Sequence, residues 1–319
     1  MDIREGYLTS QDKTRIATYE AGRPDGPPIV LTHGLGGSIA AWRHLIDHLA
    51  GRFRFLSWDY RGLYRSCRPP DGGTDESYAM RRHCEDALAL LDAAGVQKAL
   101  FIGWSMGVQV NLEMYRLHPE RFLGMVLING TSGRVFETAF RGDWLKAVAP
   151  AALDLLERSG PLVATLGPLA TRTRAIIAMI KAIGLCSPTL DESVFMDIAK
   201  DFVKLDLEAY ARIFRVLGEH DADDVLPSIA VPVLVITGEK DLFTPLETSE
   251  SIVSKVPGAE LCVVQGGTHY TPIEYPMIVN LRIERFIKER LGLPEDPNPK
   301  APTTTARATR KSGRPRRQA

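Results

Sequence analysis

The residues best suited to chemistry surround Ser105, in the pentad Gly103-Trp104-Ser105-Met106-Gly107. An apolar run, ALFI, precedes the pentad, and a segment with helical spacing, VQVNLEMYRLHP, follows it. This order predicts a strand, a tight turn and a helix. Such a turn lifts the serine Oγ clear of the backbone, and small flanking residues are needed because larger side chains would collide with the strand and helix. Ser105 is therefore the predicted nucleophile.

A serine hydroxyl is a weak nucleophile and needs a general base, in practice a histidine held by a third group. His269 lies in a glycine-rich loop, QGGTHYTPIE, directly after a late predicted strand. Parallel sheets present functional loops at this carboxyl edge. Four other histidines fall within or at the end of predicted helices and are interpreted as surface or capping residues: His44, His48, His83 and His118. His269 is thus the predicted base.

The acid that orients the base is expected in another loop that follows a strand. Asp241 meets this condition in PVLVITGEKD, and Glu239 is its local competitor. The chain order Ser105, Asp241, His269 is the order of nucleophile, acid and base in the fold that uses a strand-turn-helix nucleophile. Asp241 is therefore the predicted acid.

Attack on a carbonyl creates an oxyanion, which two donors from separate chain segments can stabilise. One predicted donor is the backbone N–H of Met106, at the start of the helix after the turn. The other is expected from the glycine-rich loop HGLGG after the apolar run PIVLT, with Leu35 as the first choice and Gly36 as the second. His33 of the same loop is interpreted as structural, because His269 already fills the role of base.

The elements that must position these residues alternate short apolar runs with longer amphipathic segments. This alternation is typical of an α/β fold with a mostly parallel sheet, and continuous apolar runs are typical of its central strands. Helices are predicted between the strands, for example at residues 75–94. The clearest predicted strands are residues 28–32, 53–58, 99–103, 124–128, 232–237 and 260–265.

A long segment without a convincing strand, residues 134–230, interrupts this alternation. We interpret it as a helical cap inserted into a core of residues 1–133 and 231–292. Its apolar helices are expected to pack on one another and on the sheet, with a membrane-surface lid as the alternative. Residues 293–319 have almost no large apolar side chains and cannot offset their ordering entropy, so we predict a disordered basic tail.

Composition excludes several other classes of protein. The chain has 319 residues, 45% hydrophobic and 24% charged, which is ordinary for a globular protein. Residues 300–319 carry seven Lys or Arg and no carboxylate, which leaves 32 basic and 39 acidic residues in the body. A body with a net charge of about −7 repels phosphate backbones, so nucleic-acid binding by the folded part is not expected.

The remaining composition bears on compartment and cofactors. The four cysteines lack the spacing of zinc or redox motifs, and the His and carboxylate positions lack ligand spacing, so neither a metal nor an organic cofactor is expected. The charged start, MDIREGYLTSQDKTR, does not fit a signal peptide, and no uncharged apolar segment is long enough to span a membrane. A cytoplasmic location is the expectation.

Five motifs occur in an order that resembles the α/β-hydrolase superfamily, specifically its serine-nucleophile, esterase-like members. They are HGLGG with the following Trp42, DYRGLYRS, GWSMG, TGEKDLFTP and GGTHYTPIEYP. The resemblance covers roughly residues 10–292 and implies an eight-stranded, mostly parallel sheet with helices on both faces and a helical cap after the sixth strand. It also implies a Ser-His-Asp triad, here Ser105, His269 and Asp241. One departure is Tyr64, which stands where the family often has the second glycine of D-x-R-G-x-G-x-S.

A serine nucleophile points to acyl transfer. Epoxide opening and halide displacement on this fold use a carboxylate nucleophile, so Ser105 argues against both. The leading hypothesis is hydrolysis of a small-molecule carboxylic ester through an acyl-enzyme. The alternatives are hydrolysis of a thioester, a lactone or a carbon–carbon bond, and a non-catalytic ligand-binding or receptor protein. Trp104 is assigned to substrate binding, and the apolar cap indicates an apolar acyl or alcohol group.

Overall fold

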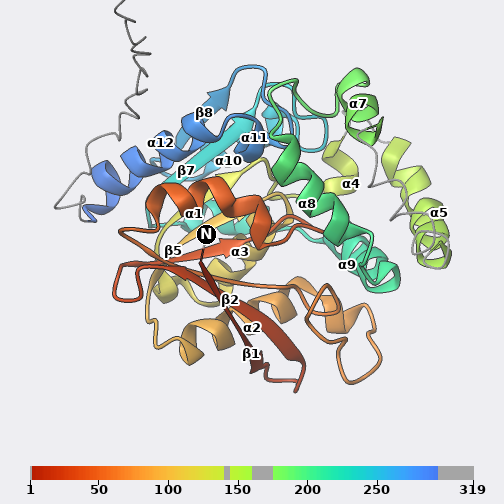
Figure 1. The fold of residues 1–319 in the computed structure, drawn as a ribbon, viewed down its shortest axis with the longest axis horizontal. Helices are drawn as coiled ribbons and strands as arrows, with labels where there is room; N and C mark the ends of the chain where they lie inside the picture. The colour runs from red at the N-terminus through yellow and green to blue at the C-terminus, as the bar shows by residue number, and fades with distance from the viewer. Residues whose placement is uncertain (1, 140–143, 160–174, 294–319) are drawn as a thin grey trace, which may run out of the picture.

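An eight-stranded sheet runs through the centre of the protein, as the resemblance implies (Figure 1). The computed structural model describes residues 2–139, 144–159 and 175–293, so nearly all of the predicted tail lies outside the described residues. The strands are β1 (Ile3–Thr9), β2 (Arg15–Gly22), β3 (Pro28–Thr32), β4 (Arg54–Trp58), β5 (Ala99–Trp104), β6 (Phe122–Ile128), β7 (Val233–Gly238) and β8 (Glu260–Val264). Their spatial order is β1-β2-β4-β3-β5-β6-β7-β8.

The sheet is parallel from β4 to β8, whereas β1 pairs with β2 and β2 pairs with β4 in antiparallel fashion. The six strands predicted from apolar runs correspond to β3–β8. Strands β5 and β7 are buried along their whole length, and continuous burial on both faces produces continuous apolar runs. Strand β1 is partly exposed throughout and β2 alternates, so neither has such a run.

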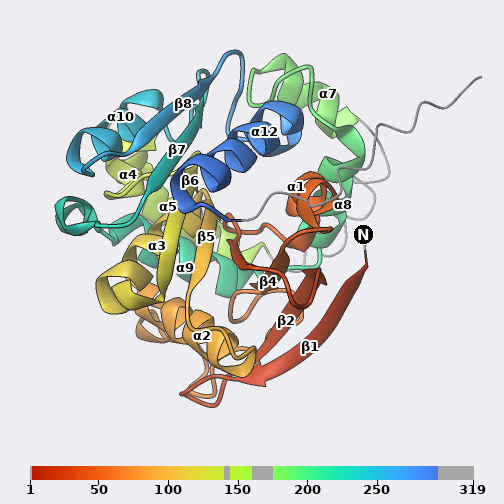
Figure 2. The ribbon, with the colours of Figure 1, turned by 90° about the vertical axis from the view of Figure 1, so that its left-hand side faces the viewer.

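Helices cover both faces of the sheet. Figure 2 shows α1 (Arg43–Leu49) and α12 (Pro276–Phe286) on one face, and α2 (Met80–Ala93), α3 (Met106–Leu117) and α10 (Leu246–Lys255) on the other. Successive strand residues point to opposite faces. Leu31 and Ile102 accordingly belong to the apolar core with α1 and α12, whereas Val30 and Phe101 belong to the core with α2 and α3. Helices therefore cover both faces of the sheet, and the loops at the carboxyl ends of the parallel strands are left to form a site.

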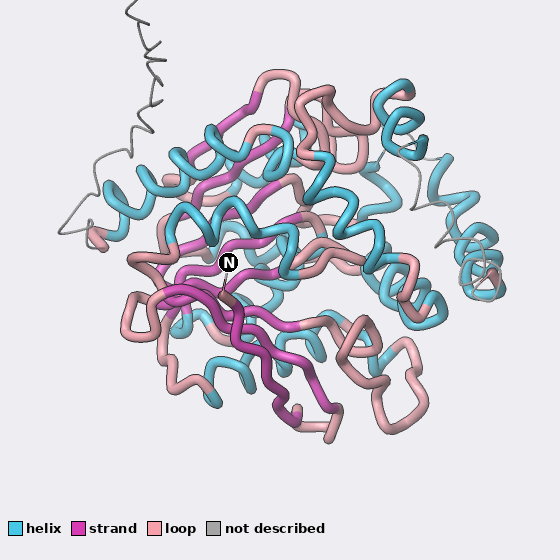
Figure 3. The backbone as a smooth tube through the Cα atoms, viewed as in Figure 1, coloured by secondary structure: helices cyan, strands magenta, loops and turns pink. Residues whose placement is uncertain are grey.

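The elements described between β6 and β7 are all helical, and Figure 1 shows α4, α5, α7, α8 and α9 gathered beyond one end of the sheet. They are α4 (Val135–Thr138), α5 (Trp144–Arg158), α7 (Ala175–Ala182), α8 (Glu192–Phe202), α9 (Leu207–Glu219) and the 3₁₀ helix η5 (Asp223–Ser228). Figure 3 shows loops between the strand ends and these helices. The helical character agrees with the sequence pattern, while the division into core and cap stays a prediction.

Short helices complete the structure. They are η1 (Ile39–Trp42), η2 (Glu76–Tyr78), η3 (Pro119–Arg121), α11 (Thr271–Glu274) and η6 (Ile287–Leu291). The predicted helix at residues 75–94 corresponds to η2 followed by α2. Within the described ranges, no helix combines the length and the apolar character that crossing a membrane requires.

Candidate active site

Ser105 lies in the predicted strand-turn-helix, between the end of β5 and the start of α3. Its φ of 56° and ψ of −119° place a non-glycine residue in a rare backbone conformation, a form of strain that concentrates at functional sites. The two flanking glycines are required because other parts of the backbone pass too close to leave room for a Cβ atom. A Cβ at Gly107 would lie 2.1 Å from the Thr32 carbonyl oxygen, and one at Gly103 would lie 2.5 Å from the Gly107 carbonyl oxygen. The turn can therefore form only with both glycines.

The predicted base contacts Ser105, and the predicted acid contacts the base. His269, in the loop after β8, has its Nε2 2.9 Å from the Ser105 Oγ. Its Nδ1 lies 2.9 Å from Oδ2 of Asp241, which follows β7. Because a carboxylate only accepts hydrogen bonds, Nδ1 carries the proton and Nε2 is free to accept the serine hydroxyl. In this geometry a proton could pass from the Ser105 Oγ to His269 Nε2.

The environment of Asp241 keeps this carboxylate ionised. Its Oδ1 accepts from the backbone N–H of Phe243 at 2.8 Å and of Thr244 at 3.0 Å. Its Oδ2 accepts from the Thr244 hydroxyl at 2.8 Å and from Nδ2 of Asn129 at 2.7 Å. Burial alone raises the pKa of Asp241, but the adjacent His269 and these hydrogen bonds outweigh it and hold the pKa below its ordinary value.

Asn129 is a site residue that the sequence analysis missed. It directly follows β6, is fully buried, and adopts a φ of 45°. Besides contacting Asp241, its Nδ2 lies 3.1 Å from the carbonyl oxygen of Thr268, the residue before His269. Asn129 therefore ties the acid loop to the base loop. Its position directly after the predicted strand 124–128 could have indicated that Asn129 lies among the functional loops.

Glu239, the competitor for the role of acid, points elsewhere. Its Oε2 accepts a hydrogen bond of 2.9 Å from the backbone N–H of Gly266. The structure brings Asp241, and not Glu239, within hydrogen-bond distance of His269.

The HGLGG loop passes directly beside the nucleophile. A Cβ at Gly34 would lie 3.1 Å from the Ser105 Cβ. Leu35 and Met106, the two predicted oxyanion donors, line the same cavity as Ser105 and His269. The loop is therefore placed where it could face a carbonyl attacked by Ser105.

His33 anchors this loop inside the protein. Its Nδ1 accepts from Nε1 of Trp42 at 2.9 Å, and its Nε2 lies 3.0 Å from the Ser57 Oγ. The Ser57 hydroxyl donates its hydrogen bond to the Leu31 carbonyl, so its oxygen accepts a hydrogen bond from the Nε2–H of His33. Burial lowers the pKa of His33 to about 4, so the ring is neutral near pH 7. These contacts agree with the structural role predicted for His33.

The loop after β4 braces the HGLGG loop from the other side. Tyr64, at the position where the family often has glycine, adopts a φ of 51°, in the region that glycine favours, and its hydroxyl donates to the Gly36 carbonyl. Tyr60 donates to the His33 carbonyl at 2.6 Å. The tyrosine at position 64 therefore keeps the backbone conformation expected of a glycine and adds a contact to the loop.

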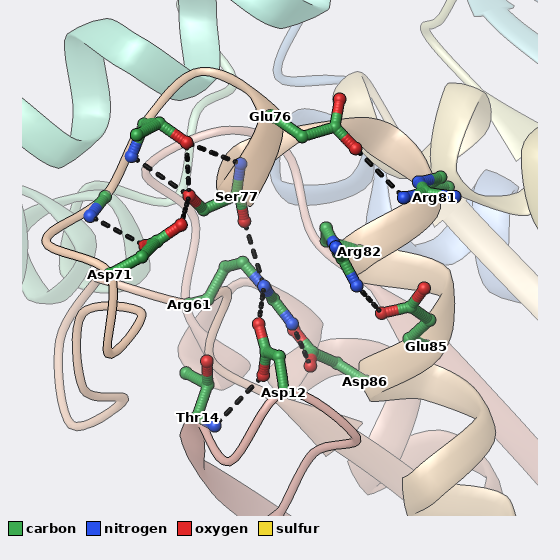
Figure 4. Close-up of polar contacts among 12 residues, drawn as sticks. Asp12, Thr14, Arg61, Asp71, Glu76, Ser77, Arg81, Arg82, Glu85 and Asp86 are labelled. Carbon is green, nitrogen blue, oxygen red and sulfur yellow. Dashed lines mark hydrogen bonds and ion pairs between the residues drawn. The ribbon is translucent and has the colours of Figure 1, made fainter.

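A buried ion-pair network holds the loop after β4 in place (Figure 4). The Arg61 guanidinium makes two bonds to Asp86, of 2.9 and 2.7 Å, and one of 2.7 Å to Asp12. It also donates to the Ser77 carbonyl at 2.9 Å. Arg61 is fully buried, and the two carboxylates satisfy its charge.

Comparison with known proteins identifies the family. A sequence model described as the alpha/beta hydrolase fold matches residues 27–276. The chain belongs to this family. Among relatives, a protein from Agrobacterium fabrum (strain C58), RutD, is 28% identical over 276 residues, covering 83% of this chain and 95% of the relative; its name gives carbamate hydrolysis as a presumed activity. The 3-oxoadipate enol-lactonase 2 of Acinetobacter baylyi is 27% identical, covering 88% of this chain and 96% of the relative.

A solved structure agrees with this family assignment. The crystal structure of a hydrolase from Pseudomonas aeruginosa PA01 superposes with a TM-score of 0.70 at 25% identity, covering 89% of this chain and 98% of that one. The eight-stranded sheet and its helices are therefore those of an alpha/beta hydrolase, and the family supports a hydrolase activity.

The hydrolase has a cavity of about 200 Å³ at the carboxyl edge of the sheet. Loops after five strands contribute to its wall: Leu35 after β3, Ser105 after β5, Thr131 after β6, Phe243 after β7 and His269 after β8. Val135 of α4 and Tyr210, Phe214 and Leu217 of α9 close it on the side of the helices between β6 and β7. The cavity is therefore mostly apolar. In the described part of the chain, no three His, Cys, Asp or Glu side chains are grouped to hold a metal ion.

Trp104 occupies a different place from the one predicted. Its side chain is only 5% exposed and is absent from the cavity wall formed by the described residues. Its indole N–H donates to the His269 carbonyl at 2.8 Å. Trp104 packs in the apolar core on the face of the sheet that α1 and α12 cover, and it supports the His269 loop from that side.

His83 also differs from the prediction, which was wrong in placing it at the surface. It is fully buried on the inner face of α2, with its ring centroid 5.0 Å from that of Tyr60. Burial, with a smaller contribution from Arg61, lowers the pKa of His83 to about 3. Helical position alone does not reveal which face a histidine occupies.

The buried histidines predict a loss of stability in acid. Unfolded His33 takes up a proton near its ordinary pKa of 6.5, whereas folded His33 stays neutral until its pKa of about 4. The free energy of unfolding should therefore fall as the pH drops from 6.5 to 4. His83 acts in the same direction. Burial raises the pKa of Asp59 to about 6 and also raises the pKa of Asp86, so these two carboxyls oppose the histidines.

Urea unfolding of the wild type and of His33→Asn at pH 6.5 and pH 4 checks this expectation. The substituted protein should lose less stability between the two pH values. An unchanged pH dependence would show that His33 is not held neutral by burial.

Proposed function

We propose that this hydrolase cleaves carboxylic esters through an acyl-enzyme formed on Ser105. The observation that carries the proposal is the continuous chain of hydrogen bonds from Ser105 through His269 to Asp241, each of 2.9 Å, at the wall of an apolar cavity. In this mechanism His269 Nε2 takes the Ser105 proton while Oγ attacks the ester carbonyl. Asp241 holds the imidazole in the required tautomer and stabilises the imidazolium that forms.

The negative oxygen of the tetrahedral intermediate is proposed to accept from the backbone N–H groups of Leu35 and Met106. When the intermediate collapses, the carbon–oxygen bond to the alcohol breaks, and His269 donates its proton to the departing alkoxide oxygen. Water then attacks the acyl carbon, with His269 again as the base, and the Ser105 Oγ recovers its proton as the acid leaves.

The cavity supports a substrate with a small or medium apolar acyl or alcohol group. Its volume of about 200 Å³ and its lining by Val135, Phe214 and Leu217 favour apolar groups over charged ones. The proposed cap, residues 134–230, supplies all three of these side chains. Substrate selection is therefore assigned to contacts between the cap and the sheet edge.

Lactones and carbamates present the same kind of carbonyl to a serine nucleophile. The names of the Acinetobacter baylyi and Agrobacterium fabrum relatives make a lactone and a carbamate the natural additions to a substrate panel. A thioester would react by the same steps.

The test combines fluorophosphonate labelling with turnover of p-nitrophenyl acetate, butyrate, octanoate and dodecanoate, a simple lactone, a phenyl carbamate and a thioester. We expect labelling, repeated turnover of esters, and a preference for the shorter acyl groups. Labelling with turnover of only the lactone, carbamate or thioester would move the assignment to that class. Absence of both labelling and turnover would overturn the proposal in favour of a binding protein.

A further inference from the structure

A polar side chain stands out in the mostly apolar cavity wall. Gln109 lies on α3, four residues after Ser105, and is only 1% exposed. It lines the same cavity as Ser105 and His269, close to the apolar side chains of the α9 segment. No step of the proposed ester hydrolysis uses Gln109.

Hydrogen bonds fix the orientation of this amide. Gln109 Nε2 donates to the Gly133 carbonyl at 2.7 Å, and its Oε1 lies 2.9 Å from His220 Nδ1. The opposite assignment of the amide would place two carbonyl oxygens 2.7 Å apart, which is unfavourable. Behind the amide, His220 Nε2 lies 3.1 Å from Oε2 of Glu113, so the histidine itself is held.

The amide retains one donor that these contacts do not use. A glutamine carries two N–H groups on Nε2, and the Gly133 carbonyl takes one. Among the residues that the structure describes, no second acceptor is bonded to Gln109 Nε2. A buried N–H without an acceptor is unfavourable, so a ligand oxygen in the cavity would be favoured at this point.

We infer that the unused N–H of Gln109 binds a second oxygen on the substrate, such as a ketone or hydroxyl oxygen. Gln109 and Ser105 line the same cavity of about 200 Å³, so an oxygen bound by Gln109 would lie only a few bonds from the scissile carbonyl. The substrate class is therefore an ester or lactone with an additional acceptor in its acyl or alcohol portion. This inference rests on the proposed ester hydrolysis at Ser105.

Matched substrate pairs test the inference. Methyl 4-oxopentanoate is compared with methyl pentanoate, and 4-oxopentyl acetate with pentyl acetate, in the wild type and in Gln109→Leu and Gln109→Met. The readout is the ratio of kcat/KM for the oxo ester to that for the alkyl ester. Any difference in chemical reactivity between the oxo ester and the alkyl ester cancels when this ratio is compared between the wild type and a variant. We expect the ratio to fall about tenfold in both variants for at least one pair, as for loss of one buried hydrogen bond.

Val135→Ala provides the matched control, because it alters an apolar part of the same wall. It should change kcat/KM for both members of a pair by the same factor. The fluorophosphonate labelling rate of each Gln109 variant reports whether the nucleophile is still assembled, and Gln109→Met preserves most of the side-chain length if Gln109→Leu folds poorly.

The outcomes separate the two proposals. Labelling and turnover with ratios unchanged within twofold in both Gln109 variants would overturn the role of Gln109 and leave ester hydrolysis intact. If the wild type is labelled but turns over neither pair, the same compounds are compared as competitors of labelling, and equal protection by oxo and alkyl esters would again overturn it. Absence of both labelling and turnover would contradict ester hydrolysis and, with it, the role inferred for Gln109.

Discussion

Replacing Ser105 with alanine is expected to lower kcat for p-nitrophenyl acetate by about 10⁵-fold or more, while the protein remains folded. The substitution removes the hydroxyl oxygen that lies 2.9 Å from His269 Nε2, so the proposed acyl-enzyme cannot form. The oxyanion donors proposed at Leu35 and Met106 would still bind the substrate carbonyl, and a small residual rate would reflect direct attack by water. Steady-state kinetics and fluorophosphonate labelling measure the effect, and labelling should disappear.

Ser254→Ala is a suitable control for this experiment. Its hydroxyl is exposed on α10 and bonds only to the Ser251 carbonyl among the described residues, so activity should stay within about twofold of the wild type. If Ser105→Ala kept a tenth of the activity or still reacted with the fluorophosphonate, the nucleophile would have to be a different residue.

Asp241→Asn is expected to reduce kcat by about 10⁴-fold with little change in overall structure. An asparagine keeps the shape of the side chain but loses the charge that stabilises the imidazolium of His269. It also offers an N–H group to Nδ1, which favours the tautomer whose Nε2 carries a proton and cannot accept from Ser105. The loss should appear in kcat across the pH range in which the wild type is active.

Glu239→Gln is the matched comparison, because Glu239 lies two residues earlier and contacts the Gly266 N–H instead of His269. It should retain activity within about twofold. A larger loss in Glu239→Gln than in Asp241→Asn would assign the orienting acid to Glu239 and contradict the arrangement proposed here.

Local sequence signals were sufficient to predict the elements of this protein that depend on neighbours in the chain. Strands β3–β8 were recognisable because central parallel strands are buried on both faces and are therefore continuously apolar. The turn at Ser105 was recognisable because the backbone approaches at Gly103 and Gly107 leave no room for a Cβ. His269 and Asp241 could be proposed as partners because loops after parallel strands meet at one edge of the sheet.

The tertiary structure decided which side chains from distant segments come together and which way they point. Asn129 bridges the Asp241 and His269 loops, and Gln109 shares its amide between Gly133 and His220. Trp104 turned out to pack in the apolar core on the face of the sheet that α1 and α12 cover, and not in the cavity wall formed by the described residues. Such contacts depend on packing between segments far apart in the sequence, so no local pattern of residues could specify them.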